Sequence, residues 1–258
     1  MAAELSILSP QWDVPNSVVA AVTTRAGGVS ESPYASLNIA NHVGDEPNNI
    51  LQNRQLLSEK FGVNLRWQWL QQIHGVESVR VSEAKESIEA DGLFTQASDL
   101  VCCVMTADCL PIFFAAKNGC EVAVAHAGWR GLAGGIVENT VSQFSVPTID
   151  ISAWLGPAIG PCHFEVGSEV RDVFLSQVSN PNNKLLLEQC FSPVENSPKL
   201  MADLVAVARL KLAALGITDV SGGDYCTYCN EEDFFSYRRD GVTGRLLSMI
   251  YIDGEDRG

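Results

Sequence analysis

The chain has 258 residues, of which 46% are hydrophobic, so it is long enough to bury a substantial core. Its 31 acidic and 17 basic residues give a formal net charge of −14 at pH 7. That charge leaves no basic surface in bulk for nucleic-acid phosphates or anionic lipid, so we expect neither nucleic acid nor membrane as a partner. A protein that acts on small molecules fits the composition better.

The N-terminal segment MAAELSILSPQWDVP shows no sign of a secretory signal. It has an early Glu4 and lacks a basic region followed by a sustained apolar run. The longest apolar runs, such as 110–116, fall well short of the roughly 20 residues that a membrane span needs. We therefore expect a cytoplasmic protein whose cysteines are reduced thiols, metal ligands or nucleophiles rather than disulfides.

The predicted elements alternate between strands and helices along the chain. Strands are predicted over 18–24, 67–72, 76–81, 100–106, 111–116, 122–125, 151–155, 217–220 and 246–252. Helices are predicted over 47–61, 132–144, 165–178 and 200–215. No repeat, low-complexity tract or Gly/Ser-rich linker divides the sequence. We expect one domain over residues 1–258, a mixed α/β or α+β sandwich.

Several familiar catalytic motifs are missing from the sequence. It contains no GxxxxGK[ST] loop, no GxGxxG after a strand, no GxSxG elbow and no HExxH helix. Nucleotide hydrolysis by a P-loop and dinucleotide chemistry are therefore poorly supported.

Three metal-ligating side chains lie at the ends of predicted strands. They are His74 in QQIHG, Cys109 in MTADCLPI and His126 in VAVAHAGWRG. Strand ends that face one way over a sheet are where binding groups converge. Two imidazoles and a thiolate suit zinc, and three protein ligands leave a fourth position open for water or substrate. The pattern predicts a metal site of the catalytic type.

Two other interpretations fit the same three residues. In one, Cys109 is a nucleophile and His126 or His74 is its base. In the other, each histidine is a satisfied core or loop residue and Cys109 is a small buried hydrophobe. The spacing along the sequence does not separate these possibilities from the metal site.

The other cysteines carry weaker signals. Cys226 and Cys229 form a CxxC motif, CTYC, but there is no second CxxC to complete a four-ligand zinc site, so we expect structural packing. Cys102 and Cys103 lie within an apolar strand and are predicted core residues. The sequence shows no evident partner for the last three, Cys120, Cys162 and Cys190.

Five arginines are candidate anion-binding groups in this acidic protein. Arg238, Arg239 and Arg245 lie in FFSYRRDGVTGR, Arg25 in TTRAGGVS and Arg130 in GWRG. The forked donors of a guanidinium suit phosphate or carboxylate. A salt bridge to one of the many carboxylates is equally compatible with the sequence.

Seven blocks of the sequence together resemble the YfiH-type laccase-domain family, also called the purine nucleoside phosphorylase YfiH, peptidoglycan editing factor or multicopper polyphenol oxidoreductase family. The blocks are TTRAGGVS, SLNIANHVGDEPNNILQNRQLL, LQQIHGVES, VMTADCLPI, AVAHAGWRGL, WLGPAIGPCHFEVGSEV and CTYCNEEDFFSYRRDGVTGR. They follow the family order over nearly the whole chain. The resemblance implies a single layered domain of mixed β-sheets flanked by helices, unlike a cupredoxin.

The resemblance also implies a set of site residues. The family's metal ligands correspond to His74, Cys109 and His126, so the expected cofactor is Zn²⁺, with Cu²⁺ as the alternative. Asp108, next to the thiolate, is a candidate proton relay or hydrogen-bond partner of a histidine. The catalytic set is completed by Arg239, and the substrate-binding candidates are Arg25, Asn38, Asp45, Asp108 and Arg130.

The activities described for such proteins differ, and physical chemistry ranks them. A multicopper oxygen site needs many further histidines, and only two lie outside the trio. Zinc needs no such support, because it lowers the pKa of bound water and can direct it at the purine C6 or at an amide.

We therefore expect a zinc-dependent enzyme that cleaves adenosine, inosine and methylthioadenosine with phosphate and also deaminates adenosine. The second hypothesis is an amidase that edits peptidoglycan precursors (UDP-MurNAc-peptide), and the third a copper-dependent polyphenol oxidase. A non-enzymatic alternative, a zinc-stabilised interaction module, predicts a fourth protein ligand. His42 and His163 are the first candidates for it.

Overall fold

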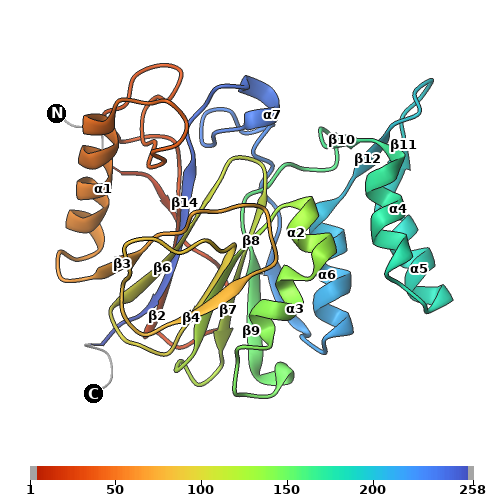
Figure 1. Ribbon diagram of the computed structural model, residues 1–258, viewed down its shortest axis with the longest axis horizontal. Helices are drawn as coiled ribbons and strands as arrows, with labels where there is room; N and C mark the ends of the chain where they lie inside the picture. The colour runs from red at the N-terminus through yellow and green to blue at the C-terminus, as the bar shows by residue number, and fades with distance from the viewer. Residues whose placement is uncertain (1–4, 255–258) are drawn as a thin grey trace.

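Two β-sheets pack face to face at the centre of the protein in a computed structural model, which describes residues 5–254 (Figure 1). The first sheet has the strand order β1 (Ile7–Leu8), β2 (Val18–Thr23), β14 (Leu246–Ile252), β6 (Leu100–Thr106) and β3 (Arg66–Gln68). The second has the order β13 (Asp219–Gly222), β9 (Ile151–Leu155), β7 (Leu110–Ala116), β8 (Val122–Ala127), β5 (Gly92–Thr95) and β4 (Ser78–Val81). Both sheets mix parallel and antiparallel pairs.

Helices cover the outer faces of the two central sheets, and a small third sheet lies to one side (Figure 1). The helices are α1 (Pro47–Phe61), α2 (Trp129–Gly134), α3 (Ile136–Val141), α4 (Ser168–Ser176), α5 (Pro181–Glu188), α6 (Leu204–Ala214) and α7 (Tyr237–Asp240), with a 3₁₀ turn at Thr148–Asp150. The third sheet has the order β10 (Glu165–Val166), β12 (Leu200–Ala202) and β11 (Phe191–Pro193). The architecture is the expected α+β sandwich of mixed sheets and helices, and it is not a cupredoxin barrel.

Strand β6 shows why a continuously apolar strand suits the centre of such a sandwich. Side chains alternate between the two faces of a strand. The even-numbered residues 100–104 face the second sheet, and the odd-numbered residues 101–105 face α1. Cys102 and Cys103 are therefore core residues, as the sequence predicts, and burial raises the pKa of both thiols.

The six-stranded sheet contributes to a second core on its other face. There Ile112 and Phe114 of β7 and Ala125 of β8 pack with helices α2, α3, α4 and α6. On the inner face, Phe113 of β7 and Val124 of β8 join the core between the two sheets. β7 and β8 are thus packed on both faces, and this packing fixes the position of the start of β7 relative to the end of β8.

Three of the predicted helices have wrong bounds. The helix predicted over 132–144 is two helices, because Gly135 takes a left-handed conformation with φ of 110° and interrupts it. The helix predicted over 200–215 begins with strand β12, and α6 starts only after Asp203, whose side chain accepts a hydrogen bond from the Ala206 N–H. The helix predicted from residue 165 begins after strand β10.

Among the helices within residues 5–254, none has both the length and the apolar character needed to cross a membrane. The first four residues of the segment considered for a secretory signal lie outside the described residues.

Candidate metal centre

The three predicted metal ligands converge at one end of the β7–β8 pair. Cys109 directly precedes β7. His126 is the next-to-last residue of β8 and pairs with Pro111 of β7. His74 follows β3 in the chain and has a positive φ of 59°, a conformation that non-glycine residues rarely adopt. One donor atom from each residue lies within 4.8 Å of the others, and the two imidazole centroids are 4.8 Å apart.

Asp91 is a buried carboxylate that holds both histidines, and no motif in the sequence marks it. Its Oδ1 lies 2.7 Å from the His126 Nδ1 and accepts the His74 backbone N–H at 3.0 Å. Its Oδ2 accepts the backbone N–H of Gly75 at 2.6 Å. Because Asp91 occupies the His126 Nδ1, the Nε2 of that ring is the nitrogen left to face Cys109. A carboxylate behind a histidine is the usual arrangement around a metal ligand.

The hydrogen bonds of Asp108 go to groups other than a histidine, and its role as a proton relay stays a prediction. Its carboxylate accepts hydrogen bonds from the Thr227 hydroxyl and from the Arg238 backbone N–H, both at 2.6 Å. Asp108 also has a positive φ of 94°. Its position beside Cys109 turns the side chain toward the loop around residue 227 rather than toward a histidine.

The electrostatics of the cluster favour a thiolate at neutral pH. Burial acts to raise the pKa of Cys109, but the charge of His126 and hydrogen bonds from His126 and His74 outweigh it and bring the pKa to about 6. Burial acts to lower the pKa of His126, but Cys109 and Asp91 outweigh it and raise the pKa to about 9. A thiolate beside two imidazoles fits a divalent metal ion, and it also fits a nucleophile with an adjacent base.

Gly128, in the GWRG segment, gives the cluster the space it needs. A Cβ atom at this position would lie 2.9 Å from the Cys109 Sγ and 3.3 Å from the His74 Cδ2. Both distances are shorter than ordinary van der Waals contacts. Gly128 therefore lets the backbone pass directly beside the donor atoms before α2 begins.

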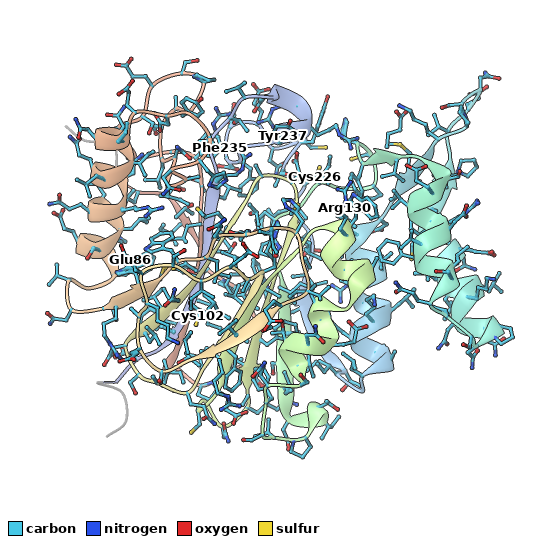
Figure 2. All side chains as sticks on the ribbon, in the orientation of Figure 1. Glu86, Cys102, Arg130, Cys226, Phe235 and Tyr237 are labelled. Carbon is cyan, nitrogen blue, oxygen red and sulfur yellow. The ribbon has the colours of Figure 1, made fainter. Side chains whose placement is uncertain are left out.

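The cluster opens into a cavity of about 520 Å³. Besides the three donors, its lining is basic, aromatic and polar: His42, Gln72, Asp108, Trp129, Arg130, Phe164, Tyr237, Arg238 and Arg245 are among the residues that form it. In Figure 2, Tyr237 is labelled beside α7 and Arg130 beside the start of α2. A small molecule in this cavity would lie beside the three donors and three arginines, Arg130, Arg238 and Arg245.

Two of the predicted polar site residues line the cavity, namely Asp108 and Arg130. Arg239 does not, although Arg238 next to it does. The Arg239 guanidinium donates to the backbone carbonyls of Thr227 and Phe234 and pairs with Asp240. It therefore holds the loop rather than facing a ligand.

Arg25, Asn38 and Asp45 also lie away from the cavity. The Arg25 guanidinium donates to the carbonyls of Ala35 and Glu231 at a separate hollow of the surface. The buried Asn38 side chain donates to Asp45 at 2.9 Å. These residues hold N-terminal loops in place, and Arg238 and Arg245 supply the guanidinium groups that face the cavity instead.

The two remaining histidines do not complete the cluster. His42 lines the cavity but is outside the group of three close donors, and His163 lies in a different group. The fourth protein ligand that a zinc-stabilised interaction module requires is thus not supplied by either candidate.

The layered α+β fold that positions the three donors is shared with known proteins. A family model described as multi-copper polyphenol oxidoreductase laccase matches residues 19–253, and the chain belongs to this family. It is similar to the purine nucleoside phosphorylase PA4543 of Pseudomonas aeruginosa, with 43% identity over 95% of this chain and 98% of the relative.

Two further similarities agree with that assignment. The purine nucleoside phosphorylase YfiH of Escherichia coli is 43% identical over 95% of this chain and 98% of its own length. The crystal structure of the Neisseria meningitidis protein NMB0706 has a TM-score of 0.88 and 42% identity, and the match covers 96% of this chain and 99% of that one. The resemblance that the seven sequence blocks predict is therefore confirmed.

Proposed function

We propose that the protein is a metal-dependent purine nucleoside phosphorylase that also deaminates adenosine. The observation that carries the proposal is the cavity, in which two imidazoles, a thiolate and several guanidinium groups face one space. The similar proteins of Pseudomonas aeruginosa and Escherichia coli are named purine nucleoside phosphorylases, which supports the same reaction class.

The proposed metal ligands are His74, Cys109 and His126, and their donor set suits zinc. When bound there, zinc would supply a Lewis acid and lower the pKa of water. Asp91 would keep the His126 ring in the tautomer whose Nε2 faces the metal, since its carboxylate holds Nδ1. Gly128 would keep the third side of the site free of a side chain.

Phosphorolysis also needs an anion site, because a phosphate oxygen forms the bond to the ribose C1′ as the bond from C1′ to the purine N9 breaks. We assign the phosphate to the exposed Arg130, whose guanidinium lies 4.4 Å from the Trp129 ring centroid. Arg238 and Arg245 add positive charge to the same cavity, although backbone carbonyls already occupy part of each guanidinium. Trp129, Phe164 and Tyr237 offer apolar surface for the purine.

The test is incubation of purified, metal-analysed protein with inosine, adenosine or methylthioadenosine, with and without phosphate. We expect phosphate-dependent release of the free base and ribose 1-phosphate, and release of ammonia from adenosine, measured by chromatography. Arg130→Ala should raise the apparent KM for phosphate about tenfold or more, since a charge-assisted hydrogen bond is worth roughly 1.5–3 kcal/mol. Arg171→Ala, an exposed arginine paired with Asp172, is the matched control.

A second variant separates the two roles proposed for the thiolate. Loss of metal and activity together in Cys109→Ser identifies a ligand, whereas loss of activity with the metal retained identifies a nucleophile. Absence of base release at every phosphate concentration would rule out the phosphorylase. In that case the same preparation is to be assayed for amide cleavage of UDP-MurNAc-peptide and for polyphenol oxidation after copper loading.

A further inference from the structure

A second group of metal-ligating side chains lies where two loops meet, away from the trio. One loop follows β9 and carries Cys162 and His163, and the other follows β13 and carries Cys226 and Cys229. One donor atom from each of the four residues lies within 4.8 Å of all the others. The sequence shows no partner for Cys162 and only a lone CxxC at 226–229, because 67 residues separate the halves of the group.

We propose that Cys162, His163, Cys226 and Cys229 form a second, structural zinc site that ties these two loops together. Three thiolates and one imidazole are a common ligand set of four-coordinate structural zinc. Such a site is closed, with no position left for substrate. It therefore differs in kind from the three-donor trio, which opens into the cavity.

The distances among three of the donor atoms, those of Cys162, His163 and Cys229, are close to those of a tetrahedral zinc site. Bonds of roughly 2.3 Å to sulfur and 2.0–2.1 Å to nitrogen place tetrahedral donors roughly 3.5–3.8 Å apart. The Cys162 and Cys229 Sγ atoms are 3.5 Å apart. The His163 Nδ1 is 3.1 Å from the Cys162 Sγ and 3.3 Å from the Cys229 Sγ. An outward shift of a few tenths of an ångström would fit the ion.

The backbone around Cys226 is arranged to hold a thiolate. The Gly160 N–H donates to its Sγ at 3.2 Å, and the N–H groups of Tyr228 and Cys229 donate to it as well. Backbone donors stabilise the thiolate, which is the form that binds metal. A Cβ atom on residue 160 would lie 3.1 Å from the Cys226 Sγ, so this close approach depends on a glycine.

The imidazole is also held in place. The His163 ring stacks on Tyr228, with centroids 3.9 Å apart and an angle of 13° between the rings. Tyr228 lies within the CTYC motif, so the motif both supplies two sulfurs and positions the histidine. The ring presents Nδ1 to two of the sulfurs.

The first of the two loops lines the cavity of the trio, and helix α7, which follows the second loop, lines it as well. Ile159 and Phe164 come from the first loop, and Tyr237 and Arg238 follow the second. Between the loops, the Thr227 N–H donates to the Ala158 carbonyl at 2.9 Å, and the Arg238 guanidinium donates to the Glu165 carbonyl at 2.9 Å. A metal ion at their junction would fix the spacing of this wall of the cavity.

The experiment counts zinc per chain in protein purified under reducing conditions. The Cys109→Ser background removes a ligand of the trio, so that zinc retained there reports the second site. We expect one zinc per chain in Cys109→Ser and none in Cys109→Ser/Cys229→Ser. Cys120 is an exposed cysteine outside both groups. Cys120→Ser is the matched control, and it should contain as much zinc as the wild-type chain.

X-ray absorption at the zinc edge of the Cys109→Ser protein tests the same site without any change to its ligands. We expect a shell of three sulfurs and one nitrogen. No zinc in Cys109→Ser, equal zinc in the single and double variants, or a disulfide among the three cysteines of the reduced protein would overturn the proposal. Base release by the wild-type chain is independent of these results, so the proposed function and the second site fail separately.

Discussion

Asp91 is the residue on which the geometry of the trio most depends. One carboxylate binds the His126 ring and the backbone turn that carries His74, so it fixes two of the three donors relative to each other. An asparagine can keep the hydrogen bond at one oxygen. Its amide group, however, would face the Gly75 N–H that the second oxygen now accepts.

Asp91→Asn should therefore weaken zinc binding at the trio by about 10–100-fold, the usual cost of losing the carboxylate behind a metal-bound histidine. Competition of the Cys229→Ser protein with a chelating dye measures this affinity without zinc from the second site. Asp172→Asn changes an exposed aspartate on α4 and serves as the control. An unchanged affinity in Asp91→Asn would show that Asp91 does not orient the ligands.

Residue chemistry singled out the trio as one of three possibilities, because imidazoles and a thiolate at strand ends can converge, and the family resemblance then favoured the metal site. The same reasoning could not find Asp91, which lies 35 residues from His126 and meets it only through the pairing of β5 with β8. Arg238 and Arg239 show a second limit. They are adjacent in sequence, yet only Arg238 lines the cavity, and the direction of each side chain is set by the short helix α7.

At the scale of elements, Glu121 ties the start of β8 to two neighbouring segments. Its buried carboxylate accepts hydrogen bonds from the Ser145 hydroxyl and backbone N–H and from the Gln96 side chain. Burial acts to raise the pKa of Glu121, but the bonds from Ser145 outweigh it, and the pKa falls below its ordinary value of 4.5. A carboxyl whose pKa is lower in the folded chain than in the unfolded chain stabilises the fold when the pH is above its unfolded pKa. This contribution is lost as the pH falls through its folded pKa.

Glu121→Gln should lower the free energy of unfolding at pH 7 by about 1–3 kcal/mol, because an amide leaves one backbone donor unpaired. The difference in free energy of unfolding between the two chains should shrink as the pH falls below 4.5, because the wild-type carboxylate then becomes protonated and loses its charge. Urea unfolding at pH 7 and at acidic pH measures both values. Glu59→Gln, on the exposed face of α1, is the control, and a difference independent of pH would contradict the assignment.

The elements with the clearest local signals were predicted with their observed bounds. β6, β9 and β14 are short apolar strands, and α1 has proline in its first turn. The errors arise where tertiary pairing decides. Residues 200–202 fit a helical period, but they pair with β11 and β10 and form a strand before Asp203 caps α6. Strand β5 was not predicted, because its four residues lie within a short segment of mixed character.

For the whole molecule, we propose that residues 1–258 form one cooperative unit. The six-stranded sheet belongs to two cores, one between the sheets and one under the helices, so neither core can be exposed without disturbing the other. Loss of packing anywhere in this sheet should destabilise the entire chain.

Leu93→Ala, which removes a fully buried side chain of β5 in the six-stranded sheet, should lower the free energy of unfolding by about 2–5 kcal/mol. Leu51→Ala, on an exposed face of α1, is the matched control and should change it by less than about 0.5 kcal/mol. Circular dichroism and tryptophan fluorescence should follow one common transition in both variants. Two separated transitions would contradict the single cooperative unit.

The hydrogen bonds to Asp91 have a consequence for how a metal would load at the proposed site. Asp91 holds the His126 ring and the turn that carries His74, so we expect an ion to enter a site whose donors already lie together. A site whose donors do not move on binding selects little between metal ions of similar size. The intrinsic order of affinity then places Cu²⁺ above Zn²⁺. We therefore expect the metal content to follow the supply in the cell, with zinc where copper is withheld and copper where it is abundant. Chains of one sequence would then reach the laboratory with different metals and different chemistry.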